Sequence, residues 1–345
     1  MILKARKRGI YLYRPASFDA FYIAKELYRK NRQLGGRKEP LRNFQYVFKE
    51  NPHVAALSWI IQRKGEEVTA EFGKQVETFS NGFFEGVWSG DFTKPSTLFT
   101  SIRFGTGVIK GNNYFDILPM SNNYEPIFMV RIKEGDALIA SNSINFLIAY
   151  TRYEYSIELL THLKDIVQNN HIATAKGNLK YSPIVIENED FVFYRFISDQ
   201  IRVYFNGTIR LVSSPEPYNF KSFNEYRSLL SYVIKTSIQN AQSKSRRVPL
   251  RPLTSITKGY DSTATSVLAF EAGCKQAVAI DVIVHGTQDS GRDVAECFGL
   301  AVTDYPHIAG KVLDTLQFNY AGELEDTATE FVGTVGQGDD LHLNP

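Results

Sequence analysis

Cysteine is scarce in this chain. Among 345 residues only Cys274 and Cys297 are cysteines, and they form no Cys-x-x-Cys pair. This excludes a disulfide framework and is typical of a reducing compartment. No apolar run is long enough to span a bilayer, and no apolar signal core follows the basic first residues. We therefore expect a cytoplasmic protein without a membrane partner.

Two common functional signatures are also missing. No Gly-Lys-Ser or Gly-Lys-Thr sequence of the Walker type occurs, and the histidines show no metal-ligand spacing. Charge is unevenly distributed, because residues 1–50 hold 13 Lys and Arg against 4 Asp and Glu, whereas residues 271–345 hold 3 against 13. A basic segment can attract nucleic acid, but no RNA-binding motif accompanies it, so we do not expect a nucleic-acid partner.

Length and hydrophobic content fit two domains. Residues 1–214 are turn-rich and aromatic, with a strong hairpin signal at Asn206-Gly207, and they predict an antiparallel α+β domain. Pro215 and Pro217 separate this pattern from a helical one, so we expect a second, α/β domain over residues 218–345.

The second domain begins with the best helix pattern of the chain. Ser222 and Glu225 form a capping box before apolar residues at helical spacing. Further along, the pattern predicts strands at 253–257, 277–284 and 300–305, with a helix in each interval. A β-α-β-α-β order is typical of a parallel sheet with helices on both faces, which binds ligands at the carboxyl ends of its strands.

Residues 255–263 lie at such a strand end and read Ser-Ile-Thr-Lys-Gly-Tyr-Asp-Ser-Thr. Gly259 would let the backbone approach an anion, and the first helical N–H groups, near Asp261 to Thr263, would point at it. The loop is therefore a predicted anion site. The alternative is structural: Asp261 or Ser262 simply caps the helix after a tight turn.

The loop resembles the pyrophosphate loop of the ATP pyrophosphatases, whose usual form is SGGxDS followed by Ser or Thr. Thr257 stands for the first Ser, Gly259 for the second Gly, and Asp261, Ser262 and Thr263 for the end of the motif. Lys258 replaces the first Gly, where its side chain would either crowd the phosphates or add a positive charge. A long helix, a basic connector and a Val-Pro step precede the loop, as in the synthetase domain of asparagine synthetase and its relatives.

A second resemblance lies in the first domain. Residues 125–128, 135–143 and 144–150 are similar to the strand, Gly turn, strand end and helix that close the glutaminase domain of that family. Taken alone, they predict a hairpin that runs into a helix. The family's glutaminase uses an N-terminal cysteine, whereas this sequence begins with Met1. The resemblance thus implies a degenerate glutaminase-like domain, as in the beta-lactam synthetase and lasso peptide cyclase branches.

The resemblance implies an ATP- and Mg²⁺-dependent adenylating ligase. A small-molecule or peptide carboxylate would attack the α-phosphorus of ATP, and an amine donor would then displace AMP to form an amide. The implied nucleotide-binding residues are Thr257, Lys258, Gly259, Tyr260, Asp261, Ser262 and Thr263. Asp261 and Asp339, the latter in the Gly-rich acidic sequence 336–340, are the implied Mg²⁺ ligands, and no catalytic residue is identified.

Two other functions stay open from the sequence. One is a pyrophosphate loop that adenylates a nucleobase or a tRNA, and the other is a non-catalytic ATP-binding scaffold. Fewer residues follow the loop than the family's synthetase domain needs, so we expect this domain to be incomplete.

Overall fold

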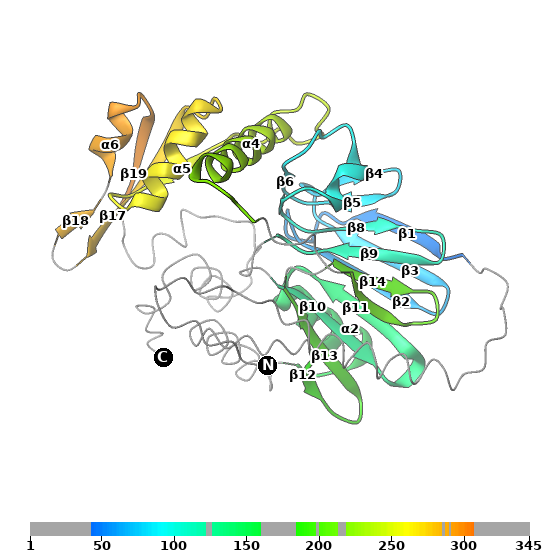
Figure 1. Cartoon of the computed structure of the whole chain (residues 1–345). Helices are drawn as coiled ribbons and strands as arrows, with labels where there is room; N and C mark the ends of the chain where they lie inside the picture. Colours follow the sequence, from blue (N-terminus) through cyan, green and yellow to red (C-terminus); the bar gives the residue numbers. More distant parts are fainter. Residues whose placement is uncertain are drawn as a thin grey trace, which may run out of the picture.

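The computed structural model describes residues 43–121, 126–159, 184–197, 200–212, 219–284, 287–289 and 291–306. The fold is mixed α+β with several sheets. Two large sheets and a two-stranded one are formed by residues before 213, and a smaller sheet with parallel strands is formed by residues after 253 (Figure 1). The predicted domain boundary around 214–218 falls outside the described residues, as does Asp339.

The first sheet has seven strands in the order β1-β3-β2-β11-β10-β13-β12. In chain order they are β1 (Gln45–Glu50), β2 (Trp59–Lys64), β3 (Glu67–Phe72), β10 (Ile127–Ile132), β11 (Ala137–Ser141), β12 (Ile184–Glu187) and β13 (Phe191–Phe196). Neighbouring strands are antiparallel except β1 and β3, which are parallel. The prediction of an antiparallel sheet is therefore wrong for this one pair.

The second sheet has six antiparallel strands in the order β15-β14-β9-β8-β5-β4. They are β4 (Glu77–Phe79), β5 (Gly82–Phe84), β8 (Gly107–Lys110), β9 (Tyr114–Leu118), β14 (Gln200–Tyr204) and β15 (Ile209–Val212). The short strands β6 (Val87–Trp88) and β7 (Arg103–Phe104) form a separate pair, and the 3-10 turns are Pro95–Phe99 and Glu134–Asp136. The predicted hairpin turn at Asn206-Gly207 joins β14 to β15, with Gly207 at φ +77°.

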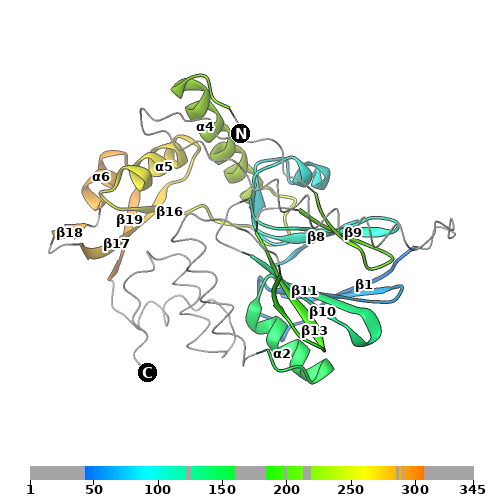
Figure 2. The same ribbon diagram turned by 60° about the horizontal axis from the view of Figure 1, so that its bottom comes forward.

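The main core lies between these two sheets, because alternate side chains of each strand point inward. Its most buried members include Trp59, Phe83, Phe115, Ile117, Ile127 and Val203. Helix α2 (Ile144–Tyr155) packs on the other face of the seven-stranded sheet (Figure 2), where Leu147 belongs to one buried cluster with Ile60 and Val130. The predicted hairpin running into a helix is confirmed as β10, β11 and α2.

Helix α4 (Phe223–Ala241) begins where the capping box predicts it. The Ser222 hydroxyl accepts a hydrogen bond from the Glu225 amide at 3.2 Å, and the Glu225 carboxylate accepts one from the Lys221 amide at 2.8 Å. The first turns of α4 are exposed, whereas Val233 and Ile238 near its end are buried. Among the described residues, no helix is long and apolar enough to cross a membrane.

The predicted β-α-β-α-β order is confirmed. Strands β16 (Thr254–Ile256), β17 (Gln276–Val284) and β19 (Ala301–Pro306) are parallel, with β17 in the centre. Helix α5 (Tyr260–Glu271) joins β16 to β17, and helix α6 (Arg292–Cys297) precedes β19. A strand that the sequence pattern did not predict, β18 (Thr287–Asp289), returns antiparallel to the end of β17.

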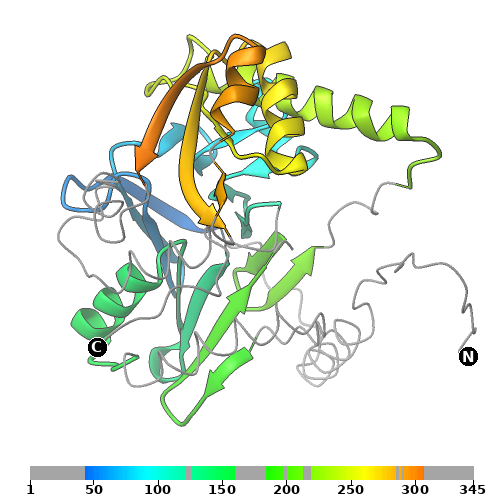
Figure 3. The same cartoon turned by 90° about the vertical axis from the view of Figure 1, so that its left-hand side faces the viewer.

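Both connecting helices cover the same face of this sheet. Thr254 and Ala277 are paired in register and therefore point the same way. Ser266 of α5 hydrogen-bonds to Thr254 at 3.0 Å, and Ala295 of α6 packs with Ala277. Figure 3 shows α5 and α6 on one side of β17 and β19. Within the described part of the chain, no helix covers the opposite face, so the prediction of helices on both faces is wrong for this part.

Candidate nucleotide-binding loop

The loop of residues 257–259 connects the carboxyl end of β16 to the first turn of α5. Because β16 belongs to a parallel sheet, the loop lies at the edge where such sheets bind ligands. Lys258, Gly259, Tyr260 and Asp261 are exposed, and Tyr260 retains 95% of its accessible surface. The loop is therefore open to solvent.

Two hydroxyl groups fix the shape of the loop. The hydroxyls of Thr257 and Ser262 are hydrogen-bonded to each other at 2.8 Å. The Thr257 amide donates to the Ser262 hydroxyl at 3.1 Å, and the Gly259 amide donates to the Thr257 hydroxyl at 3.1 Å. The Thr263 hydroxyl donates to the Thr257 carbonyl at 3.4 Å. These hydroxyl groups therefore fix the conformation of the loop through hydrogen bonds within it.

The amides in the first turn of α5, unlike the groups of the loop, are mostly without a hydrogen-bond acceptor among the described residues. The Thr263 amide donates to the Gly259 carbonyl at 3.2 Å, which is the first helical hydrogen bond. The amides of Tyr260, Asp261 and Ser262 have no acceptor within the described ranges, as expected for a helix start. Together with the helix dipole, equivalent to about half a positive charge, they favour an anion.

Gly259 is not required by backbone conformation. Its φ of −69° is open to any L-residue. A Cβ built there would lie 3.2 Å from the Thr257 hydroxyl oxygen and 3.9 Å from the Ser262 hydroxyl oxygen. Apart from its two chain neighbours, no other atom of the described residues would lie within 4 Å. Glycine therefore leaves open space beside the amides of the first turn, which is what close approach of a phosphate needs.

A second glycine, Gly291, packs against the backbone at the start of the loop, and the sequence did not predict this contact. Gly291 precedes α6 with φ +60°, and a Cβ there would lie 2.5 Å from the carbonyl carbon of Thr257. The backbone after β18 thus lies directly against the start of the loop. The only sequence signal is a glycine at the start of a predicted helix.

The predicted metal ligands are only partly described. Asp261 is exposed in the first turn of α5, and Asp339 lies outside the described residues. Among the described residues, no group of three His, Cys, Asp or Glu side chains has a geometry that could hold a metal ion. Mg²⁺ is usually bound through one or two carboxylates together with substrate phosphates, so a single exposed carboxylate beside an anion site fits it.

The structure therefore brings the predicted residues Thr257 to Thr263 together in one strand-loop-helix unit and leaves the predicted partner Asp339 undescribed. Comparison with known proteins adds no relative, because no protein-family model matches the chain and no curated protein matches it.

Proposed function

We propose that the chain is an ATP-dependent adenylating ligase of the asparagine synthetase superfamily, with no glutaminase activity of its own. The observation that supports this most is the first turn of α5. Three amides without an acceptor among the described residues follow a strand of a parallel sheet, and Asp261 lies in the same turn. This fits the order of groups in the pyrophosphate loop of the ATP pyrophosphatases, which the sequence resembles.

In this proposal the amides of Tyr260, Asp261 and Ser262 hydrogen-bond the pyrophosphate that leaves ATP. Such donors act without reorganisation, because the hydroxyl pair of Thr257 and Ser262 already fixes the turn. Asp261, with Asp339 as its proposed partner, would hold Mg²⁺, which supplies charge neutralisation at the phosphates. The exposed Lys258 would lie beside the same anion.

The proposed substrates are a small-molecule or peptide carboxylate and an amine donor. The carboxylate oxygen attacks the α-phosphorus and pyrophosphate leaves. The amine then attacks the acyl carbon, AMP leaves, and the amine loses a proton. We also propose a cytoplasmic location, since the buried Cys274 and the exposed Cys297 are both free thiols.

A second candidate is a non-catalytic ATP-binding scaffold. It is favoured by the internal bonding of the loop, because the Gly259 amide and the Thr257 hydroxyl are already paired with the loop itself. Fewer donors would then face the phosphates than in a loop whose amides are all free.

Titration of the full chain with ATP, with and without Mg²⁺, tests the binding site directly. We expect saturable binding that Mg²⁺ strengthens, and no binding of either form would refute both candidates. Release of pyrophosphate in the presence of mixed carboxylates and amines separates the ligase from the scaffold. Tight RNA binding that weakens steeply with salt would instead support a tRNA-modifying enzyme.

A further inference from the structure

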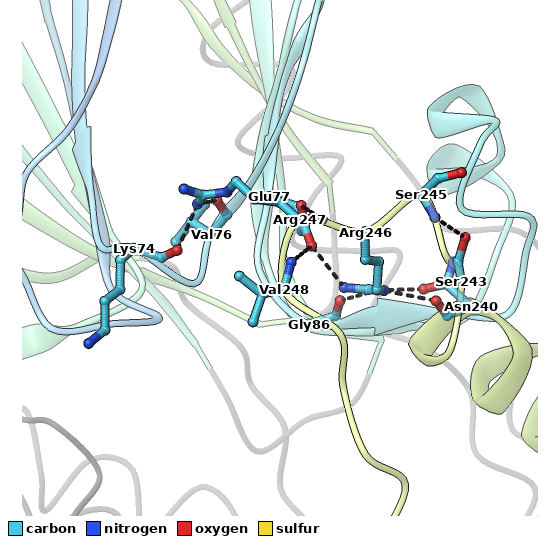
Figure 4. Close-up of polar contacts among 10 residues, drawn as sticks. All are labelled: Lys74, Val76, Glu77, Gly86, Asn240, Ser243, Ser245, Arg246, Arg247 and Val248. Atoms are coloured by element: carbon cyan, nitrogen blue, oxygen red, sulfur yellow. Dashed lines mark hydrogen bonds and ion pairs between the residues drawn. The ribbon is translucent and has the colours of Figure 1, made fainter.

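Strands β1 to β15, which build the two large sheets and the β6-β7 pair, form what we call the two-sheet part of the chain. A buried carboxylate of this part binds the segment that leads to the loop (Figure 4). Glu77, at the start of β4, is only 4% exposed. Its carboxylate accepts hydrogen bonds from the amides of Arg247 at 3.2 Å and Val248 at 3.1 Å. These residues belong to the connector, residues 242–253, between α4 and β16. One side chain of the two-sheet part thus fixes two consecutive amides of the connector.

The neighbouring arginine completes a buried network. The Arg246 side chain is 1% exposed, and its Nη1 lies 3.7 Å from Oε1 of Glu77. Its other nitrogens donate to the Asn240 carbonyl and side-chain oxygens at 2.8 and 2.6 Å and to the Gly86 carbonyl at 2.8 Å. The guanidinium also lies over the Phe92 ring, 4.5 Å from its centroid. Burial of these charges is sustained by their mutual pairing.

The same network holds the end of α4. Asn240, in the last turn of α4, donates through Nδ2 to the Gly90 carbonyl at 2.9 Å. Arg247 adds an outer contact, pairing with Glu50 and donating to the Lys74 and Val76 carbonyls. The side chains of Arg247 and Glu50 are each more than two-fifths exposed, so this outer pair is screened by solvent.

Both flanks of the loop are attached to this network. On one side the connector continues into β16, which ends at the loop. On the other side Ile238 of α4 packs with Ala269 and Cys274, at the end of the helix that begins at the loop. A displacement of the connector or of α4 would therefore move β16 and α5 relative to each other.

We infer that Glu77 is a positioning residue: it sets the geometry of the loop at 257–259 from the two-sheet part. It does so by fixing the connector and, through Arg246 and Asn240, the end of α4. The consequence for nucleotide binding rests on the function proposed above, whereas the consequence for the packing of α4 on α5 does not.

The two cysteines and two tryptophans of the chain make the test possible without a ligand. Cys274 is buried between α4 and α5, and Cys297 is exposed, so the reaction of Cys297 with dithiodipyridine is an internal standard. Trp59 and Trp88 are both fully buried in the two-sheet part, so their fluorescence during urea unfolding reports on that part.

Glu77→Gln is compared with Glu50→Gln, which removes the exposed carboxylate bound to the same connector. We expect Glu77→Gln to speed the reaction of Cys274 about tenfold, because a hydrogen-bonded charge is lost and local opening is more frequent. The Cys297 rate and the urea midpoint from tryptophan should stay close to wild type. Glu50→Gln should change neither cysteine rate by more than about twofold.

An unchanged Cys274 rate in Glu77→Gln would overturn the inference, and so would an equal rise in Glu50→Gln. A faster Cys274 reaction accompanied by a large fall of the tryptophan midpoint would also overturn it, since Glu77 would then only stabilise its own domain. If Glu77→Gln does not fold, the same criteria apply to Glu77→Asp, which keeps the charge but shortens its reach.

The second readout is the affinity for Mg²⁺ and ATP. We expect Glu77→Gln to weaken it about tenfold and Glu50→Gln to leave it within about twofold. Equal affinity in Glu77→Gln and wild type would overturn the positioning role. If wild type itself does not bind ATP, the proposed function fails, and the cysteine rates still decide the role of Glu77.

Discussion

Thr257 and Gly291 meet backbone against backbone, although they lie 34 positions apart along the chain: a Cβ on Gly291 would lie 2.6 Å from the Thr257 carbonyl oxygen. Gly291 also has a left-handed φ of +60°, which favours glycine for a second, independent reason. The start of the loop is therefore supported by the segment that follows β18, and the shape of the loop depends on two separate stretches of sequence.

Gly291→Ala should destabilise the protein and disturb the loop. The left-handed conformation costs an alanine about 1 kcal/mol, and the collision with Thr257 should add roughly 1–3 kcal/mol as in overpacked cores. Gly299→Ala is the matched control, because Gly299 has φ +79° but, apart from its chain neighbours, no atom of the described residues within 4 Å of its Cβ position. Urea unfolding of both variants should show a clearly larger loss for Gly291→Ala. Equal losses of stability in the two variants would mean that the backbone at Thr257 shifts to accommodate the new methyl group with little loss of free energy.

Much of the second part of the fold could be predicted from local pattern. The capping box at Ser222 and the strand pattern at 277–284 each act over a few residues, and each appears where expected. The same holds for the hairpin at Asn206-Gly207, whose positive φ is a local requirement. Local signals of this kind depend on capping, backbone conformation and side-chain pattern within one turn or one strand.

The missed features depend on contacts between distant residues. Glu77 and Arg246 pair across the two parts of the chain, and nothing near either residue in the sequence marks it as buried. The parallel pairing of β1 with β3 likewise depends on tertiary packing, since strand propensity does not encode direction. In the loop, the motif predicts which residues meet. It did not predict that the Thr257 and Ser262 hydroxyls would pair with each other.

Asp261→Ala should abolish the effect of Mg²⁺ on ATP binding. Asp261 is exposed and is the acidic residue in the first turn of α5, so its loss should remove a metal ligand without removing the helix start. In Mg²⁺ we expect an affinity at least about tenfold weaker than wild type, and in chelator the two proteins should bind ATP alike. Tyr260→Ala, at the neighbouring exposed position, should stay within about twofold. Pyrophosphate release as fast in Asp261→Ala as in wild type would contradict the proposed role.

The fall in the free energy of unfolding at alkaline pH should depend on Tyr150 in α2. Burial raises the pKa of Tyr150 to about 12, with a smaller effect of nearby Glu154, and its hydroxyl donates to Oε1 of Gln62 at 3.3 Å. In the unfolded chain a tyrosine ionises near pH 10, so this contribution is complete below about pH 10 and is lost as the pH rises toward 12.

Tyr150→Phe should therefore show a shallower fall of the urea midpoint between about pH 10 and 12 than wild type. Tyr153→Phe, on the same helix with 86% of its surface exposed, controls for the loss of a phenol hydroxyl. If both variants follow the wild-type profile, ionisation of Tyr150 is not coupled to unfolding.

Gly259→Ala separates the two interpretations of the loop, an anion site or a helix start with a structural role alone. The N-cap of α5 is Gly259 without a side-chain cap, so the predicted capping by Asp261 or Ser262 is wrong. At φ −69° an alanine is allowed, and such a substitution stabilises a chain by about 0.4–1 kcal/mol through the unfolded state. The 3.2 Å approach of its Cβ to the Thr257 hydroxyl offsets part of that gain, so we expect a melting temperature close to wild type. ATP affinity should nevertheless fall about tenfold, since the new methyl group occupies space beside the amides of Tyr260 and Asp261. Ala264→Ser, which adds one heavy atom at an exposed position further along α5, should leave both quantities unchanged. If Gly259→Ala keeps full ATP affinity, no phosphate approaches the backbone there, and the first turn of α5 is only the start of a helix.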